Sequence, residues 1–478
     1  MSPATHRHDT LAALDHAHVW HPFTPMRQWR RRDPLIIDRA EGFHLVDTLG
    51  RRYIDGTSSL WCNVHGHRVP EIDQAIQRQL GCVGHSTFLG AGSPPGIELA
   101  AHLCARAPGR LNKVFYSDAG ATALELAFKM AVGYWYHRGQ PQRTRFIGLR
   151  GAYHGDTTGA MSVGFCDLFH QPFAAMVFPT HFIPAPDACR ATDTMHAAAG
   201  RQRRRDAACW PSEDEALGQV MAEQALDSLD CLLQRHGSTT AAVIAEPIMQ
   251  GAAGMLCQPP GFLAAISEIA RRHGVLLIAD EVATGFGRTG TLFACEQEGV
   301  EPDVMCLAKG ITGGYLPLAA TLATDEIEHA FCGELADRRT LFHGHTYTGN
   351  PLACAAALAS LALIDRNNLI AQVATTAQIM SDRLDALRNP GEAPHVIDVR
   401  QRGLMVGIEL GRDRNAGKSL DFDRTTGAVL CEAMRRRGVL LRPLGDVLVL
   451  MPIPAIDHTT LHKLLDVVIE TVSAWRVP

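Results

Sequence analysis

The sequence predicts an α/β fold, in which helices on both faces cover a large, mostly parallel sheet and a smaller α+β domain is attached. Strand-like apolar runs alternate with segments of helical periodicity from about residue 113 to 325, a pattern typical of parallel sheets whose strands are joined by helices. From about residue 395, closely spaced strand pairs replace this alternation. The chain has 478 residues, which is too many for one ordinary hydrophobic core.

These patterns divide the chain into four expected segments. Residues 1–70 are expected to form an N-terminal arm and part of the small domain, and residues 71–350 the large α/β domain. Residues 351–390 begin with a run rich in Ala and Leu and are expected to be connecting helices. Residues 391–478 are expected to complete the small domain, with strand pairs followed by an amphipathic helix.

The composition is that of an ordinary globular enzyme, with 46% hydrophobic and 20% charged residues. A net charge of −5 gives no indication of a nucleic-acid or anionic-membrane partner, and no apolar run has the length of a transmembrane helix. The thirteen cysteines never occur as C-x-x-C and no H-E-x-x-H occurs, so neither a disulfide framework nor a metal site is expected. With a polar N-terminus, these features predict a cytoplasmic protein.

The first eighty residues predict an arm, a hairpin, a loop and a helix in succession. His18–Trp29 is aromatic and broken by prolines, as in arms that pack on another surface. Leu35–Ile54 alternates apolar and polar residues around a Leu-Gly turn, which predicts a hairpin. Asp55–Arg68 has no regular period and many small and aromatic residues, as in a loop that lines a site. Glu71–Leu80 has helical spacing.

A possible anion site follows the first strand of the alternating region. Lys113–Gly120 is expected to be a strand that ends in a glycine turn, and Ala121–Arg138 a helix. The free N–H groups and the dipole at the start of a helix both favour an anion. Gly120, Ala121 and Thr122 could therefore hold a phosphate, although a helix start alone is a weak signal.

The next strand ends at an aromatic residue flanked by glycines. Arg145–Gly155 is expected to carry Tyr153 and His154 to the same edge of the sheet. An aromatic ring there could stack on a planar cofactor, and an ordinary packed aromatic is about equally consistent with the local sequence. Further along, Pro184–Leu217 is polar and irregular, which predicts a surface excursion, and its basic run Arg201–Arg205 is typical of a solvated loop.

Two strands further along end in charges of opposite sign. The apolar run from Val275 ends in Asp280, and the run from Val304 ends in Lys309. Ligands of open parallel sheets bind beyond the carboxyl ends of the strands. A desolvated lysine there is a nucleophilic amine that can form a Schiff base, and an aspartate can keep a pyridine nitrogen protonated. Pyridoxal phosphate (PLP) requires this pair, whereas a lysine that reaches out to solvent is the alternative for Lys309 alone.

A second cofactor motif is present but is in the wrong context. Gly285, Gly287 and Gly290 match the dinucleotide fingerprint G-x-G-x-x-G. In that fingerprint the glycines follow a strand directly and open a helix. Here several residues separate the strand from the glycines, and no long helical pattern follows them. A nicotinamide cofactor is therefore not expected.

Six motifs resemble the class III, PLP-dependent aminotransferases, and among them the 8-amino-7-oxononanoate aminotransferase (7,8-diaminononanoate, or diaminopelargonic acid, synthase) family of biotin biosynthesis. The motifs are HVWHPFT, SLWCNVHGH, GAYHGDT, DEVATGFGRTG, AKGITGGYLPLAATL and FHGHTYTGNPLACAAALASL. The resemblance runs from about residue 18 to the C-terminal helix, apart from the segment 184–217. It implies fold type I, PLP as cofactor, and a homodimer whose active sites lie at the subunit interface.

The resemblance also assigns roles to particular residues. It implies that Lys309 binds PLP covalently, that Asp280 binds the pyridine nitrogen and that Tyr153 stacks near the ring. It implies that Gly120 and Ala121 of one subunit and Thr346 of the other bind the phosphate, and that His345 also contacts the cofactor. The residues that it implies for the substrate are Phe23, Trp61, Tyr153, Lys309, Gly344 and Arg442, with Arg442 on the substrate carboxylate.

The amino donor stays open between S-adenosylmethionine and lysine. Members of the family that use S-adenosylmethionine usually have two tryptophans, a tyrosine and a serine where this chain has Leu60 with Trp61, Phe23 and Ala121. Loss of an indole and a phenol hydroxyl would weaken contacts with a charged, adenine-bearing donor. The alternative functions are another class III aminotransferase acting on an ω-amino acid or diamine, and a non-catalytic binding protein.

Overall fold

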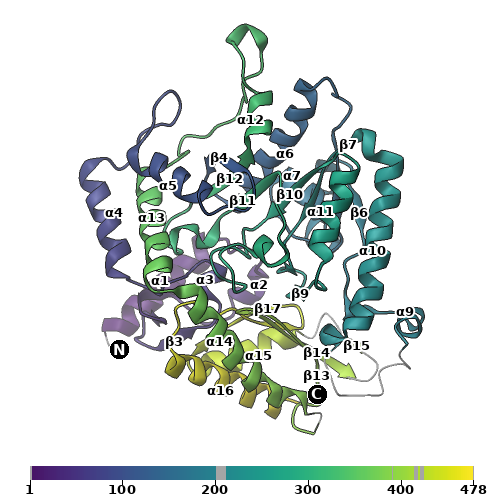
Figure 1. The fold of residues 1–478 in the computed structure, drawn as a ribbon. Coiled ribbons are helices and arrows are strands. Elements are labelled where there is room, and N and C mark those ends of the chain that lie inside the picture. The colour runs from purple at the N-terminus through teal and green to yellow at the C-terminus, as the bar shows by residue number, and fades with distance from the viewer. Residues whose placement is uncertain (1–2, 201–210, 390, 414–417, 420–424, 477–478) are drawn as a thin grey trace.

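The computed structural model describes residues 3–200, 211–389, 391–413, 418–419 and 425–476. Its centre is a seven-stranded sheet with the strand order β4-β12-β11-β10-β7-β5-β6 (Figure 1). In chain order these strands are β4 (Leu111–Ser117), β5 (Arg145–Leu149), β6 (His181–Ile183), β7 (Thr240–Ala245), β10 (Leu276–Asp280), β11 (Val304–Leu307) and β12 (Ala319–Thr324).

The sheet is mostly parallel, as the sequence predicts. Strands β11, β10, β7, β5 and β6 pair in parallel, whereas β12 runs antiparallel to both of its neighbours, β11 and β4. Strand β4 therefore has the same direction as the parallel strands. Because parallel strands share one carboxyl edge, the residues that follow β4, β5, β10 and β11 lie along the same edge of the sheet.

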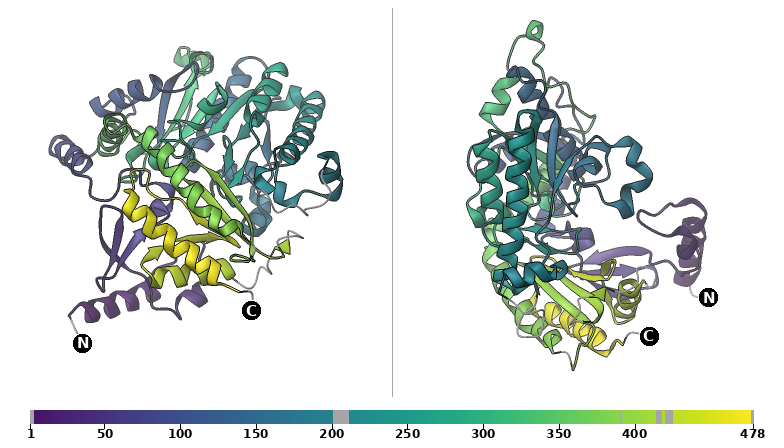
Figure 2. Two further views of the ribbon diagram at one scale, coloured as in Figure 1. Left: turned by 60° about the horizontal axis from the view of Figure 1, so that its bottom comes forward. Right: turned by 90° about the vertical axis from the view of Figure 1, so that its right-hand side faces the viewer.

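Helices cover both faces of this sheet (Figure 2). Alternate residues of β10 enter different cores: Leu276 and Ile278 pack with α6 (Gly120–His137). Leu277 and Ala279 pack in the core that contains α10 (Glu215–His236) and α11 (Phe262–Arg272). Burial on both faces explains why the strands are continuous apolar runs without alternation. Helix α10 begins directly after Asp214, which caps it by accepting a hydrogen bond from the Leu217 N–H at 3.1 Å.

Two smaller sheets lie outside the central one, and the first of them joins the two ends of the chain. The first has the strand order β1-β2-β3-β16. Strands β1, β2 and β3 pair antiparallel in succession, so the segment expected to be a hairpin is a three-stranded meander, and β16 pairs in parallel with β3. The second has the order β13-β14-β18-β17 with β15 on β14. The strands are β1 (Ile37–Glu41), β2 (His44–Asp47), β3 (Arg52–Asp55), β13 (Val396–Arg402), β14 (Met405–Asp413), β15 (Lys418–Ser419), β16 (Val439–Leu440), β17 (Arg442–Leu444) and β18 (Val447–Leu450). A separate two-stranded sheet consists of β8 (Met249–Gln250) and β9 (Leu256–Cys257).

The remaining helices surround these sheets, and the N-terminal helix stands away from the body of the chain (Figure 2). They are α1 (Pro3–His18), α2 (Met26–Trp29), α4 (Pro70–Cys82), α5 (Pro94–Cys104), α7 (Thr158–Val163), α8 (Asp167–His170), α9 (Asp193–Ala198), α12 (Asp325–Ala330), α13 (Pro351–Arg366), α14 (Leu369–Leu384), α15 (Thr426–Arg436) and α16 (His458–Ala474). Among the described residues no single helix is long and apolar enough to cross a membrane, and one bent pair, α13 with residues 369–388, passes that test by length and composition together.

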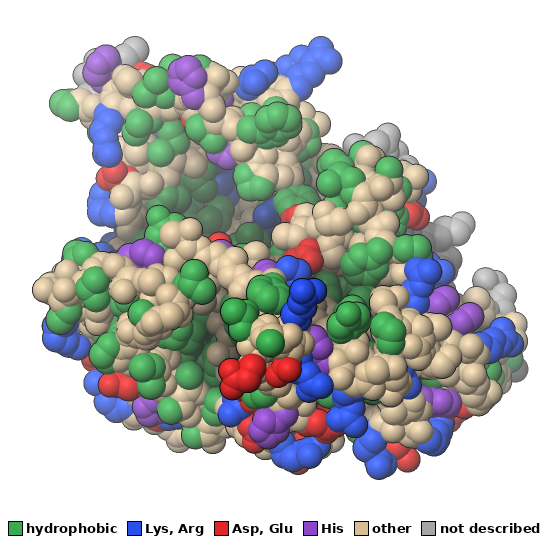
Figure 3. Space-filling model, turned by 90° about the horizontal axis from the view of Figure 1, so that it is seen from above, with side chains coloured by type: hydrophobic (Ala, Val, Ile, Leu, Met, Phe, Trp, Pro, Cys, Tyr) green, Lys and Arg blue, Asp and Glu red, His purple; other side chains and the backbone are tan. Residues whose placement is uncertain are grey.

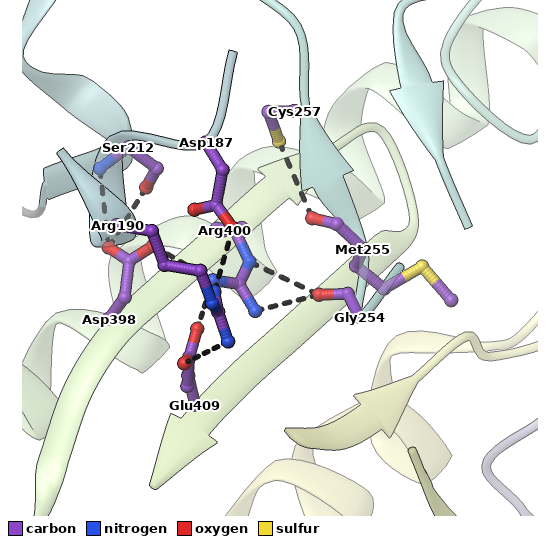
Figure 4. A network of polar contacts seen from close by, with 9 residues as sticks. All are labelled: Asp187, Arg190, Ser212, Gly254, Met255, Cys257, Asp398, Arg400 and Glu409. Carbon is purple, nitrogen blue, oxygen red and sulfur yellow. Dashed lines mark hydrogen bonds and ion pairs between the residues drawn. The ribbon is translucent and has the colours of Figure 1, made fainter. Parts of the chain in front are cut away.

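The segment between β6 and α10 is attached to the strands of the C-terminal sheet (Figure 4). Ser212 donates through its hydroxyl to Asp398 Oδ1 at 3.0 Å, and Arg190 lies 3.5 Å from Glu409 Oε1. Arg400, on the same sheet, donates to the carbonyl of Gly254 at 2.7 Å. The described part of this predicted surface excursion therefore packs against β13 and β14. The basic run 201–205 lies outside the described residues.

Candidate active site

A cavity of about 690 Å³ lies at the carboxyl edge of the central sheet. Its lining includes residues that directly follow β4 and β11, residues from Tyr153 onward in the loop after β5, and the last residue of β10. The sequence-predicted members of this lining are Trp61, Gly120, Ala121, Tyr153, Asp280 and Lys309. Seen from above, the molecule is hollowed and hydrophobic side chains lie within the hollow (Figure 3). The strand ends therefore bring together the amine, the carboxylate, the aromatic ring and the helix start, as the sequence predicts.

Lys309 begins a short 3-10 turn, Lys309–Thr312, directly after β11. Its backbone has φ of 46°, which is the left-handed region that non-glycine residues rarely adopt. The side chain opens into the cavity, and its amine lies 5.1 Å from the centre of the Trp61 ring. Burial lowers the pKa of Lys309, although the carboxylates of Asp280 and Glu246 act against that shift. The lowered pKa increases the fraction of neutral, nucleophilic amine.

Asp280 is held from two sides at the end of β10. Its Oδ2 is 2.6 Å from His154 Nδ1, and its Oδ1 accepts a hydrogen bond from the Val282 N–H at 3.0 Å. Burial alone would lower the pKa of His154, but the hydrogen bond and charge of Asp280 raise it overall. Asp280 is thus an oriented, buried carboxylate, suited to a protonated ring nitrogen. The sequence placed His154 at this edge but did not reveal its contact with Asp280.

Glu246, one residue beyond β7, links two walls of the cavity. Its carboxyl oxygens accept hydrogen bonds from the N–H of Tyr153 at 3.1 Å and of Gly251 at 2.9 Å. Burial raises the pKa of Glu246 to about 7. On the opposite side of the Gly251 backbone, an added Cβ would come within 3.2 Å of the Trp61 ring. Glu246 therefore fixes the backbone of Tyr153 and the surface against which Trp61 packs.

The start of α6 forms a tight pocket for an anion. The first N–H groups of a helix have no intrahelical acceptor, so those of Gly120 and Ala121 are available to a ligand. A Cβ on Gly120 would lie 2.6 Å from Val282 Cγ1, and a Cβ on Gly155 would lie 2.4 Å from that of Ala121. Glycine is therefore the residue that fits at both positions. Thr122 is occupied otherwise, since its hydroxyl donates to Asp118 at 2.9 Å.

Trp61 reaches the cavity from an unusual left-handed turn. Four consecutive residues, from Ser58 to Trp61, have φ between 49° and 70°. Each left-handed residue other than glycine costs roughly 1–2 kcal/mol, so the surrounding structure must hold this turn. Asp55 binds the N–H of Ser59 at 2.9 Å and its hydroxyl at 2.7 Å, and the Ser58 hydroxyl donates to the carbonyl of Met451 at 2.6 Å. Strain of this kind gathers at functional sites.

Phe23 and Arg442 lie together, and the lining of the cavity does not include them. The Arg442 guanidinium carbon is 5.9 Å from the centre of the Phe23 ring, and Phe23 meets Phe169 edge to face at 5.6 Å. Arg442 opens β17 and is exposed, and its charge reaches the phenol of Tyr153. Tyr153 in turn donates a hydrogen bond to Asp156 at 2.7 Å. Among the described residues no carboxylate forms an ion pair with Arg442, so its guanidinium could receive one near Tyr153.

Three further predicted residues, Gly344, His345 and Thr346, also lie outside the lining of their own chain's cavity. They lie in the segment between α12 and α13, which is placed along α6 by a 3.1 Å contact between His343 Nδ1 and Lys129 Nζ. Lys129 is nine residues beyond the start of α6, which is roughly 13 Å along a helix. The structure of one chain therefore does not bring these residues to the predicted phosphate site.

The residues of the cavity fit PLP. An amine and a carboxylate lie at the ends of two adjacent strands. At the helix start beside them are glycines where a larger side chain would collide with its neighbours, which leaves the N–H groups open to a phosphate. Within the described part of the chain, no cluster of three His, Cys, Asp or Glu side chains could hold a metal ion. Sequence reasoning missed Arg288, a buried residue of the GFGRTG motif that contacts the left-handed turn. The GFGRTG motif is recognisable in the sequence, but the residues that the Arg288 guanidinium contacts are more than 150 positions away, so the sequence gives no sign of them.

Known proteins resemble this chain over nearly its whole length. The sequence profile "Aminotransferase class-III" matches residues 26–472. An adenosylmethionine-8-amino-7-oxononanoate aminotransferase of Nitratidesulfovibrio vulgaris is 50% identical over 97% of this chain and 82% of its own length. The enzyme of the same name from Geobacter sulfurreducens is 44% identical over 96% of both chains.

Solved structures give the same result. The crystal structure of the adenosylmethionine-8-amino-7-oxononanoate aminotransferase from Methanocaldococcus jannaschii superposes with a TM-score of 0.87 at 38% identity, covering 97% of this chain and 98% of that one. An amine transaminase from an uncultivated Pseudomonas species, solved in its PLP-bound form, has a TM-score of 0.86 at 33% identity over 95% of this chain and 98% of its own. These findings confirm the predicted fold type I and PLP as the cofactor, and the chain belongs to the class-III aminotransferase family.

Proposed function

We propose that this enzyme transfers an amino group from S-adenosylmethionine to 8-amino-7-oxononanoate, which gives 7,8-diaminononanoate for biotin biosynthesis. The observation that carries the proposal is the 50% identity over nearly the whole chain with an enzyme named for this reaction. Solved ω-transaminases also superpose well, for example at a TM-score of 0.88, but at 36% identity or less. Sequence identity therefore favours the biotin-pathway acceptor over a general amine.

In this proposal, residues of the sheet edge bind PLP and move protons. Bound PLP supplies an aldehyde that carries the amino group and a ring that accepts electrons from the reacting carbon. Asp280, oriented by His154, holds the proton on the ring nitrogen. The Lys309 amine, whose lowered pKa favours the neutral base, would move a proton to and from the reacting carbon of the substrate. Gly120 and Ala121 receive the phosphate through their N–H groups.

Substrate binding is assigned to the outer part of the site. Arg442 forks onto the carboxylate of 8-amino-7-oxononanoate, because a guanidinium donates two parallel hydrogen bonds to such a group. Trp61 and Phe23 supply apolar surface for the aliphatic chain of the substrate. Two residues differ from those usual in enzymes that use S-adenosylmethionine: Phe23, and Leu60, which is about half exposed beside Trp61. The names of the relatives nevertheless favour S-adenosylmethionine over lysine as the donor.

We further propose a homodimer in which each subunit completes the other's site. Thr346 and His345 lie away from the cavity of their own chain, and large apolar side chains are exposed around that segment, such as Phe342 and Tyr347. Thr346 of the partner subunit would then contact the phosphate, with Gly344 of the partner subunit beside the substrate. A cytoplasmic location stays a prediction from the cysteine usage.

The donor is tested by one half-reaction at a time. Purified enzyme with bound PLP is mixed with S-adenosylmethionine or with lysine, and the visible absorption of the bound cofactor is followed. Loss of that absorption with S-adenosylmethionine alone is expected. Loss with lysine alone would replace the donor and direct attention to Leu60 and Phe23. Loss with neither donor would favour another class III aminotransferase, and Asp280→Asn serves as a folded, slow control.

A further inference from the structure

Arg288 is a buried arginine whose function the cofactor site does not explain. It belongs to the GFGRTG motif and is 2% exposed. Its Nη1 donates to the Ser58 hydroxyl at 3.1 Å and to the carbonyl of Pro452 at 2.7 Å. Its Nη2 donates to the carbonyls of Asn63 at 3.0 Å and Trp61 at 3.4 Å. One guanidinium therefore contacts both the beginning and the end of the left-handed turn.

The partners of Arg288 are neutral oxygens. Within the described ranges no carboxylate forms an ion pair with it, and burial lowers the pKa of Arg288 to about 10. Burying a cation without an ion-pair partner is unfavourable. The Arg288 guanidinium contacts the Ser58 hydroxyl and the Trp61 carbonyl, at the two ends of the strained segment that carries the Trp61 ring to the Lys309 amine.

We propose that Arg288 is a positioning residue, which holds the left-handed turn Ser58–Trp61 so that the Trp61 ring covers the Lys309 amine and keeps water from it. The inference rests on the proposed role of Lys309 as the PLP-binding amine. Two features make the guanidinium necessary. Its planar fork reaches two directions at once, whereas a lysine presents one compact charge. In addition, no residue of the turn is a glycine, so the backbone cannot adopt this conformation without support.

The test measures the protonation of Lys309 in the cofactor-free enzyme, which needs no catalysis. The chain contains five lysines, so trace labelling with acetic anhydride at a series of pH values, followed by peptide mass spectrometry, resolves Lys309 from the others. The peptide of exposed Lys463 is the internal standard. The pH midpoint of labelling, unlike its rate, is insensitive to how readily the reagent enters the cavity.

Arg288→Lys is expected to raise the labelling midpoint of Lys309 by about one pH unit, because an uncovered amine is hydrated and its charged form is favoured. Trp61→Ala should raise it similarly, and the double variant should show no larger shift than Trp61→Ala alone. Leu60→Gly, added to Arg288→Lys, should restore the midpoint because glycine adopts the left-handed conformation without strain. Leu60→Ala, which removes the same side chain but not the strain, should not restore it.

Several outcomes would overturn the proposal. They are an unchanged midpoint in Arg288→Lys, a shift that adds fully to that of Trp61→Ala, and equal effects of the glycine and alanine variants at position 60. If Arg288→Lys does not fold by circular dichroism, Ser58→Ala is used, since it removes one acceptor of the guanidinium. Failure of the proposed function would give a different result. In that case the Lys309→Ala variant would keep both the visible absorption of bound PLP and its activity.

Discussion

At the scale of single residues, the site depends on groups whose ionisation is shifted by burial. Lys309 has a lowered pKa and Glu246 a raised one, and both shifts result mainly from removal from water. The Asp280 carboxylate is oriented by His154, whose Nδ1 lies 2.6 Å from Oδ2. The sequence indicated Lys309 and Asp280, because each is a charged residue at the end of an apolar run. It gave no signal for the pairing of Asp280 with His154, which joins residues 126 positions apart.

Glu246 predicts a pH dependence of stability in the cofactor-free enzyme. Its pKa is raised from 4.5 to about 7 in the folded state, so the folded protein binds the proton more tightly than the unfolded chain. The stabilisation is therefore complete below pH 4.5 and is lost as pH rises through about 7. The loss is at most roughly 3.5 kcal/mol, at about 1.4 kcal/mol for each pKa unit.

The measurement is the free energy of unfolding from urea titrations between pH 4.5 and 8. Glu246→Gln is expected to flatten the slope over this range, and Glu301→Gln, at an exposed position, should leave it unchanged. A slope that is the same in Glu246→Gln and in the unsubstituted protein would contradict the assignment. A lower overall stability of Glu246→Gln would not, because its amide nitrogen cannot accept one of the two backbone hydrogen bonds.

At the scale of secondary-structure elements, strand ends were predictable and irregular segments were not. The runs that became β10 and β11, and the helix start at Gly120, follow from apolar patterning and a glycine. The antiparallel direction of β12 was not apparent, because a buried apolar run reads alike in either direction. The left-handed turn at Ser58–Trp61 contains no glycine and is held by contacts from residues 288 and 451. Local propensity therefore could not reveal it.

Gly120→Ala is expected to weaken PLP binding without unfolding α6. The added methyl would lie 2.6 Å from Val282 Cγ1, so the helix start or Val282 must move. Overpacking of this kind costs about 1–3 kcal/mol, which corresponds to a roughly five- to 150-fold higher dissociation constant for PLP. The measurement is fluorescence titration of the cofactor-free enzyme with PLP.

Gly81→Ala is the matched control for that prediction. Gly81 lies in helix α4, and nothing is within 4 Å of a Cβ added there. This substitution should leave the PLP dissociation constant unchanged and increase helix stability slightly. Equal PLP affinity in Gly120→Ala and Gly81→Ala would show that the start of α6 is not where the phosphate binds.

At the scale of the whole molecule, the cavity of one chain contains the residues predicted to bind the cofactor ring but not Thr346, which is predicted to bind the phosphate. Helix α1 projects from the body of the chain (Figure 2), and Trp20, two residues after its end, is 86% exposed. Exposed apolar groups of this size are typical of interaction surfaces. A second subunit would cover them and bring its Thr346 to the site. The sequence predicted the dimer only through its resemblance to a family, because an interface leaves no periodic pattern.

Mixing two inactive variants tests the shared site. Lys309→Ala removes the amine, and Thr346→Glu places a negative charge where the partner's phosphate would bind. In a hybrid dimer one site carries both changes and the other carries neither. Random reassociation makes half of the dimers hybrid, so the mixture should recover about a quarter of the normal activity. If each chain forms its site alone, dissociating and reassociating the two variants will recover no activity.

The most direct measurement is the product formed from 8-amino-7-oxononanoate and S-adenosylmethionine by the PLP-loaded enzyme, identified by mass spectrometry. We predict 7,8-diaminononanoate from the unsubstituted enzyme and none from Lys309→Ala, which also loses the visible absorption of bound PLP. Absence of the diamine with a demonstrably PLP-loaded enzyme would contradict the proposed acceptor. Equal amounts of product from Lys309→Ala would contradict the role of Lys309, on which the account of the site depends.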